Sequence, residues 1–335
     1  MALGAAADQR LQHAVAEACA APYPADRAID AILEAGWDAH EVWSSVAQVA
    51  LSEVPPALDS DTAGNVLRSL RSVGDPQDRI RDEALVGWVL RAAAPGRRFR
   101  GEALGVLGQR ADPSFDTLIG RHASRWLTAP GVEPRTVYGT MKFLLGRPYP
   151  ISPGAMDVIG RVAFDPEYGA TVAGASFTTQ GFPETADDRE RLRRDQKDVR
   201  GAAMYIRLRH GLADQDFPRY MGLDVVGRAA AGHVLLGTLS GEYPVWTDDA
   251  GRRRAIARAR DLFMDPATHD LLEASPVGLW MFCVRRDDIT VETRRAMLQA
   301  MLDNAATTQN PEIIGFTKQF ILDAGFDPSE FTARP

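Results

Sequence analysis

Residues 26–51 read DRAIDAILEAGWDAHEVWSSVAQVAL, and this stretch decides the fold. Within residues 26–35, apolar side chains recur at the three- to four-residue spacing of one helix face. Gly36 interrupts this pattern, and a second helical pattern follows over residues 41–51. Pro55 and the proline after it then end the second helix. The stretch therefore predicts a hairpin of two helices.

The same pattern recurs along the first half of the chain. Four leucines are spaced 37 residues apart, at Leu33, Leu70, Leu107 and Leu144. A turn follows each of them, marked by Asp38, Asp75-Pro76, Asp112-Pro113 and Pro148. The spacing predicts four helical hairpins near residues 24–55, 61–95, 98–130 and 134–165. Because one such hairpin cannot bury both of its apolar faces, we expect the hairpins to stack.

The repeat stops after residue 165. Residues 166–192 contain three glycines and two prolines together with β-branched residues, which predicts an irregular insertion loop. Residues 193–335 again show helical periodicity, although less regularly, and we expect them to continue the first half. Within this half, residues 217–239 are expected to form one helix. The fold class predicted from the whole chain is all-α.

The 37-residue helix–turn–helix unit, the recurrent leucines and the Asp-Pro turns resemble the HEAT and armadillo superfamily of α-solenoids. The resemblance implies a right-handed stack of helical hairpins with one irregular insertion. Proteins of this superfamily act as scaffolds and adaptors, and some are enzymes, so the resemblance implies no catalytic residue.

Composition narrows the possible partners. The chain has 335 residues, with 45 acidic and 38 basic side chains and a net charge of −7, which makes nucleic acid an unexpected partner. Cys19 and Cys283 lie far apart in the sequence and outside any metal-binding pattern, which is typical of a reducing cytoplasm. We expect no membrane association, because no run approaches 18 apolar residues and residues 1–8 lack a secretory pattern. The scarcity of lysine among the basic residues suggests a GC-rich bacterial genome.

The common catalytic and metal-binding motifs are missing from the sequence. It contains no nucleophile elbow, Walker loop, dinucleotide-binding glycine pattern or HExxH helix. Its six histidines are never three or four residues apart, so no helix presents two histidine ligands. We therefore expect no metal and no cofactor, and the sequence leaves open whether the protein is an enzyme.

One spacing in the sequence resembles a known metal-binding motif. Asn304, Thr308 and Glu312 have the spacing of the diphosphate-metal motif of class I terpenoid synthases. Pro311 lies inside the motif and would break the helix that must aim the three side chains at one metal. We interpret the spacing as a chance match at a helix junction.

A basic helix face follows the predicted insertion. Arg193, Arg200 and Arg207 recur every seven residues on one face of the helix expected over residues 191–210. The face could hold a carboxylate, a phosphate or an acidic partner helix. A solvated face paired with neighbouring acidic residues explains the same pattern.

The other candidate binding residues are a histidine at the end of this helix and aromatic residues after it: His210, Tyr220, Trp246 and Trp280. Trp246 falls in an expected loop, where an exposed aromatic ring would be a contact point. The tryptophans of the early hairpins, by contrast, are expected in the core.

Two functions remain open from the sequence. The first is a cytoplasmic adaptor or scaffold that binds a protein or peptide through a concave face. The second is an enzyme or small-molecule-binding protein, with a pocket between the insertion and the C-terminal helices. A long open groove would favour the first, and a closed concavity with converging polar groups would favour the second.

Overall fold

The computed structural model describes residues 2–75, 77–175, 186–240, 245, 248–263, 267–268, 290–307 and 311–332. Throughout these residues the secondary structure is helical, as the sequence predicts, and they contain no β-strand. Ile80 and Ala111 form one isolated parallel bridge. None of the described helices combines the length and the apolar character needed to cross a membrane. The chain divides into two compact units, Met1–Met156 and Asp157–Pro335.

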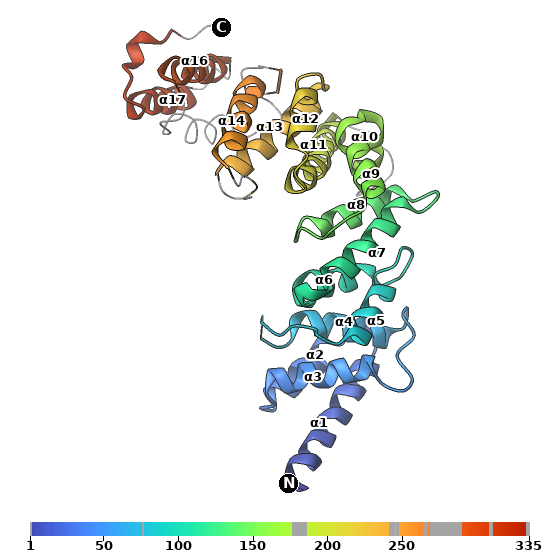
Figure 1. The fold of residues 1–335 in the computed structure, drawn as a ribbon. Helices are drawn as coiled ribbons and strands as arrows, with labels where there is room; N and C mark the ends of the chain where they lie inside the picture. The colour runs from blue at the N-terminus through green and yellow to red at the C-terminus, as the bar shows by residue number, and fades with distance from the viewer. Residues whose placement is uncertain are drawn as a thin grey trace. The chain divides into compact units, whose positions relative to one another are not determined.

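The first unit is built from helices that follow one another in space in chain order (Figure 1). Its elements are α1 (Ala2–Ala20), α2 (Asp26–Glu34), α3 (Ala39–Ala50), α4 (Asp61–Ser72), α5 (Glu83–Ala92), α6 (Arg100–Arg110), the 3-10 turn η1 (Pro113–Phe115), α7 (Asp116–Thr128) and α8 (Pro134–Leu144). Helix α9 (Pro153–Phe164) crosses the boundary between the units. The sequence predicts all of these except α1.

Short polar residues set the helix boundaries in this unit. The Asp38 carboxylate accepts hydrogen bonds from the backbone N–H groups of His40 and Glu41 at the start of α3. Ser60 caps α4 in the same way. Gly36, with φ of 91°, directly follows the C-cap of α2 and has a conformation that other residues rarely adopt.

The core of the first unit contains the tryptophans of the early hairpins. Trp43, Trp88 and Trp126 are all buried, which confirms the prediction that they are core residues. The repeated leucines Leu70, Leu107 and Leu144 are also buried, whereas Leu33 of the first hairpin is only half-buried.

Two arginines 37 residues apart bond to carbonyl groups at the ends of preceding helices. The buried Arg110 donates to the carbonyl oxygens of Arg71 and Val73, at 3.0 and 2.9 Å, where α4 ends. Arg147 donates to the carbonyl oxygen of Ala111, at 3.2 Å, where α6 ends. Carbonyl groups at a helix C-terminus lack partners within the helix, so each guanidinium satisfies groups that burial would otherwise leave unpaired.

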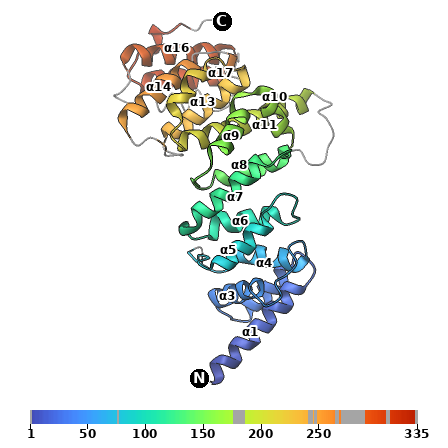
Figure 2. The same cartoon turned by 45° about the vertical axis from the view of Figure 1, so that its right-hand side comes forward.

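The second unit continues with α10 (Pro166–Gly174), α11 (Ala186–Arg209), α12 (Ala213–Tyr220), α13 (Val225–Ser240), α14 (Asp249–Phe263), α16 (Val291–Thr307), α17 (Pro311–Asp323) and the 3-10 turn η3 (Pro328–Glu330). Helices α10, α11, α13 and α14 pack against one another in this order (Figure 2). Near the C-terminus, Leu298, Leu302, Ile321 and Phe331 form a small core between α16, α17 and the end of the described chain.

Two predictions for this unit are wrong. Residues 166–174 form a helix rather than a loop, because Asp165 caps the N-terminus and Pro166 occupies the first helical position. The single helix expected over residues 217–239 is divided into α12 and α13 by a turn. The predicted insertion also includes residues 176–185, which lie outside the described residues, and residues 186–192, which belong to helix α11 rather than to a loop.

Candidate functional site

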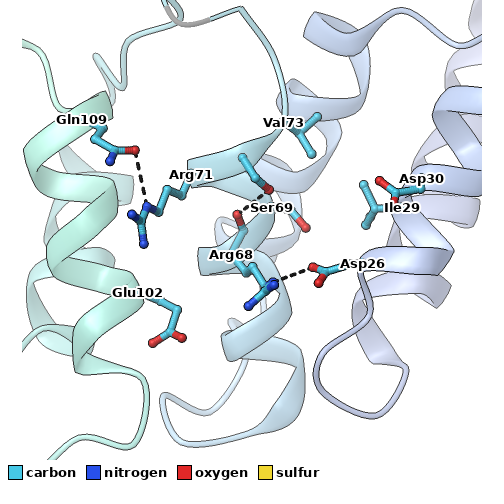
Figure 3. Close-up of a pocket in the computed structure, with 10 residues that line it drawn as sticks. Asp26, Ile29, Asp30, Arg68, Ser69, Arg71, Val73, Glu102 and Gln109 are labelled. Atoms are coloured by element: carbon cyan, nitrogen blue, oxygen red, sulfur yellow. Dashed lines mark hydrogen bonds and ion pairs between the residues drawn. The ribbon is translucent and has the colours of Figure 1, made fainter.

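A cavity of about 590 Å³ lies on the first unit, over helices α2, α4 and α6 (Figure 3). The residues that line it are Asp26, Ile29, Asp30, Arg68, Ser69, Arg71, Ser72, Val73, Glu102 and Gln109. Asp30, Arg71, Ser72 and Gln109 are exposed, so the cavity opens to solvent.

The helix periodicity explains why charged groups gather here. Helix α4 packs against both α2 and α6, and it buries the apolar side chains of Val66, Leu67 and Leu70. Arg68 and Arg71 are three residues apart and lie on the same side of α4, at the cavity. The cavity therefore collects side chains from three helices that are separated along the chain, α2, α4 and α6.

A chain of polar contacts crosses the cavity from α2 to α6. Arg68 Nε lies 2.5 Å from Asp26 Oδ1, and the Tyr23 hydroxyl donates to Glu102 Oε1 at 2.8 Å. The hydrogen bond from Arg68 to Asp26 raises the already high pKa of the guanidinium, with Tyr23 contributing in the same direction. Partial burial, followed by the hydrogen bond to Glu102, raises the pKa of Tyr23. Arg68 is thus a neutralised cation that joins two helices.

Arg71 is held in a different way. Figure 3 shows Arg68 pointing toward Asp26 on α2 and Arg71 pointing toward Gln109 on α6. A Cβ atom at Gly105 would lie 3.0 Å from Cδ and Nε of Arg71, so the arginine passes directly over this glycine. Its Nε atom donates a long hydrogen bond of 3.4 Å to Gln109 Oε1. Within the described residues, no carboxylate comes within ion-pair distance of Arg71.

The opposite wall of the cavity is acidic. Asp30 is exposed, and its carboxylate forms no ion pair with any other described residue. Ile29 lies beside it on α2 and is buried. Most of the lining consists of charged, hydroxyl and amide side chains, which can bind a partner by charge and hydrogen bonds.

The arginines predicted as binding residues lie in the second unit and have separate surroundings. Arg193 is exposed, and its Nη1 lies 3.5 Å from Glu190 Oε2. Arg200 is fully buried. It donates to the carbonyl oxygen of Ala163 at 3.0 Å and forms an ion pair of 2.5 Å with Asp224.

Arg207 is also buried and forms a two-point ion pair with the fully buried Asp216, at 2.8 and 2.7 Å. Its guanidinium lies over the Phe164 ring at 5.3 Å. Buried pairs of this kind keep the arginine in the interior of the unit. The basic face predicted from the sequence is therefore divided between one exposed residue and two buried ones.

Tyr220 and His210 lie near this interior. Tyr220 is fully buried, and its ring contacts those of Phe164 and Phe217. Its hydroxyl has no hydrogen-bond partner in the described structure, and burial strongly raises its pKa. His210 follows α11, and burial together with Arg209 lowers its pKa.

Two predicted tryptophans and the metal-like spacing complete the set of sequence predictions. Trp246 and Trp280 lie outside the described residues. Asn304 belongs to α16 and Glu312 to α17, so these two residues of the metal-like spacing are on different helices, as Pro311 predicted. In the part of the chain that the structure describes, no three His, Cys, Asp or Glu side chains gather as a metal site would require.

The cavity on the first unit is not predicted by the sequence. Its charged residues have the appearance of an ordinary solvated helix face when each helix is considered alone. Asp26, Arg68 and Glu102 are 42 and 34 residues apart, so the 37-residue spacing of the leucines does not align them.

Comparisons with known proteins give no family assignment, because no family model matches the chain and no curated protein or solved structure is significantly similar to it.

Proposed function

We propose that the first unit is a HEAT-like α-solenoid and that the protein acts as an adaptor or scaffold. Its binding surface is the face that α2, α4 and α6 form around the cavity, and its partner is an extended segment of another protein. We call this surface the α2–α4–α6 face, defined by the ten residues that line the cavity.

Contacts at a regular separation support the repeat. Side chains joined by hydrogen bonds are 38 residues apart for Arg71 and Gln109, and 38 apart for His40 and Asp78. The Arg110 guanidinium donates to the Val73 carbonyl oxygen at the end of α4, and these two residues are 37 apart in the sequence. In a stack where each hairpin contacts the next, the contacting residues are about one repeat apart in the sequence.

The open, charged cavity is the observation that carries the binding function. Its exposed lining residues include an acidic and a basic group that lack ion-pair partners among the described residues, Asp30 and Arg71. An open surface that runs over several helices suits an extended chain better than an enclosed small molecule. Charged groups at such a surface select a partner by complementarity.

Affinity capture with matched variants tests this function. Full-length wild-type protein, Arg71→Glu and Arg125→Glu would be incubated with extract of the source cells, and the retained proteins would be identified by mass spectrometry. Arg125 is exposed on α7 and does not line the cavity, so its variant carries the same charge change elsewhere. We expect a partner that the wild type and Arg125→Glu retain and Arg71→Glu loses. Equal retention by all three proteins, or by none, contradicts the proposal.

One observation favours a second candidate, a small-molecule site in the second unit. The Tyr220 hydroxyl and Nη2 of Arg200 are buried polar atoms without hydrogen-bond partners in the described structure. Buried polar groups are normally paired, and a small polar ligand would satisfy them. Native mass spectrometry of the protein purified from its source tests this candidate. A bound species of defined mass that Tyr220→Phe loses supports it, and bare protein contradicts it.

A further inference from the structure

Several arginines of the described structure lie directly over glycines in neighbouring helices. A Cβ atom at Gly139 would overlap or crowd Arg100, and the same holds for Gly160 with Arg207. Glycine inside a helix costs about 1 kcal/mol relative to alanine, so each of these positions exchanges helix stability for room beside an arginine.

The guanidinium groups of Arg100 and Arg207 both have partners within the fold. Arg100 donates to the Ala93 carbonyl and to Thr140 Oγ1, at 3.1 and 2.7 Å, and is half-buried. Arg207 is neutralised by Asp216. These two guanidinium groups are used within the fold.

Arg71 has the same arrangement over Gly105 but has no such partner. It is exposed, and the only hydrogen bond of its guanidinium in the described structure is the long one to Gln109. Gly105 and Gln109 therefore hold the guanidinium at the mouth of the cavity, with its two Nη groups available. A planar guanidinium in this position matches a carboxylate, which accepts two parallel hydrogen bonds.

The neighbouring charges support this assignment. Arg68 does not compete for an incoming carboxylate, because Asp26 neutralises it. Glu102 is engaged by the Tyr23 hydroxyl. On the opposite wall, exposed Asp30 offers a carboxylate to a cation.

We propose that the α2–α4–α6 face recognises an extended peptide with two charged positions. An aspartate or glutamate side chain binds Arg71 and Gln109, and a lysine or arginine side chain of the same peptide binds Asp30. This inference rests on the proposed peptide-binding function and adds the chemistry of its two contacts, with the acidic position toward α6 and the basic position toward α2.

Selection from a random peptide library tests the inference. Random twelve-residue peptides would be displayed at the N-terminus of a phage coat protein, so that no free carboxyl terminus can bind Arg71. They would be selected on four full-length proteins: wild type, Arg71→Glu, Asp30→Lys and the control Arg125→Glu. The wild type and the control should enrich the same motif, with one acidic and one basic position.

The two cavity variants should change one position each. On Arg71→Glu we expect the acidic position to be lost or to become basic while the basic position remains. On Asp30→Lys we expect the converse. Peptides with the wild-type motif should bind Arg71→Glu about tenfold or more weakly than wild type by fluorescence anisotropy, consistent with the loss of a charge-assisted pair.

The outcomes separate this inference from the function on which it rests. Ser72 is exposed at the cavity, and Ser72→Trp would fill the cavity without replacing a buried group. No enrichment on the wild type, or enrichment that Ser72→Trp leaves intact, contradicts peptide binding at this face. Enrichment that Ser72→Trp abolishes, but without an acidic position or with an acidic position that persists on Arg71→Glu, overturns the charge recognition alone.

Discussion

Arg110 shows how a single side chain connects two helices of the first unit. Its guanidinium is buried, donates to carbonyl groups at the end of α4, and has no carboxylate partner within ion-pair distance in the described structure. Removing the guanidinium leaves the buried Val73 carbonyl oxygen without this donor.

We therefore predict that Arg110→Ala lowers the free energy of unfolding by about 3 kcal/mol, measured by urea denaturation. Arg110→Lys should recover only a minor part, because an ammonium group cannot reproduce the guanidinium fork. The exposed control Arg125→Ala should stay within about 0.5 kcal/mol of wild type. Equal effects of Arg110→Ala and Arg125→Ala would refute the capping role.

His122 on α7 predicts a dependence of stability on pH. Burial lowers its pKa, and Arg125 and Arg121 lower it further. Because the unfolded state keeps the ordinary pKa of about 6.5, it takes up the proton first as the pH falls. The contribution of His122 to stability is complete above this value and declines as the pH falls toward the lowered pKa of the folded state.

We expect the urea midpoint of wild type to decrease more between pH 7.5 and pH 5.5 than that of His122→Gln. The comparison isolates one residue, because the carboxylates that also titrate are common to both proteins. The same decrease in both proteins would show that His122 does not contribute.

Residue identity alone could not reveal the role of Arg71. The sequence shows an arginine on the polar side of a helix, which is the ordinary place for one. Its function as a presented cation depends on Gly105 and Gln109, which lie more than 30 residues away and meet it only when α4 packs against α6.

At the scale of the elements, helix packing makes specific demands on glycine. A Cβ atom at Gly120 in α7 would overlap the carbonyl oxygen of Pro150, a backbone group that cannot rotate away. Gly87 in α5 has only the flexible end of Arg91 near it, at 3.8 Å.

Alanine substitution at these two positions should have opposite effects. Gly120→Ala should destabilise the protein by about 3 kcal/mol through overpacking. Gly87→Ala should stabilise it by about 0.5–1 kcal/mol through the better helix propensity of alanine. Thermal unfolding followed by circular dichroism measures both, and a stabilising Gly120→Ala would contradict the described approach of Pro150 to α7.

The sequence predicts most helices of the first unit because periodicity, caps and breakers agree there. It fails where these signals conflict. Helix α10 has the cap Asp165 and the first-turn Pro166, but its glycines and β-branched residues favour a loop. The sequence pattern does not indicate the turn between α12 and α13, because apolar residues continue on both sides of it.

At the scale of the whole molecule, the two compact units should respond separately to local destabilisation. Hydrogen–deuterium exchange of Arg110→Ala should increase around α4 and α6 in the first unit. Peptides from α11 and α13 in the second unit should exchange as in wild type. A uniform increase throughout the chain would show that the units unfold as one.

The candidate site belongs to this scale as well, since α2, α4 and α6 must pack together before its residues meet. The 37-residue spacing does not align Asp26, Arg68 and Glu102, and the open cavity between their helices depends on the packing angles, which periodicity does not specify. The sequence therefore predicted binding through a helical face in general and did not predict which face.

Photo-crosslinking from the α2–α4–α6 face tests the central claim most directly. A photoreactive phenylalanine analogue would replace Gln109 at the cavity or, as a control, Arg125 on α7, in full-length protein produced in its source cells. We predict that the probe at residue 109 gives a discrete crosslink to one partner protein, that the probe at residue 125 does not, and that adding Arg71→Glu removes the crosslink. No crosslink from residue 109, or the same products from both positions, would contradict partner binding at this face.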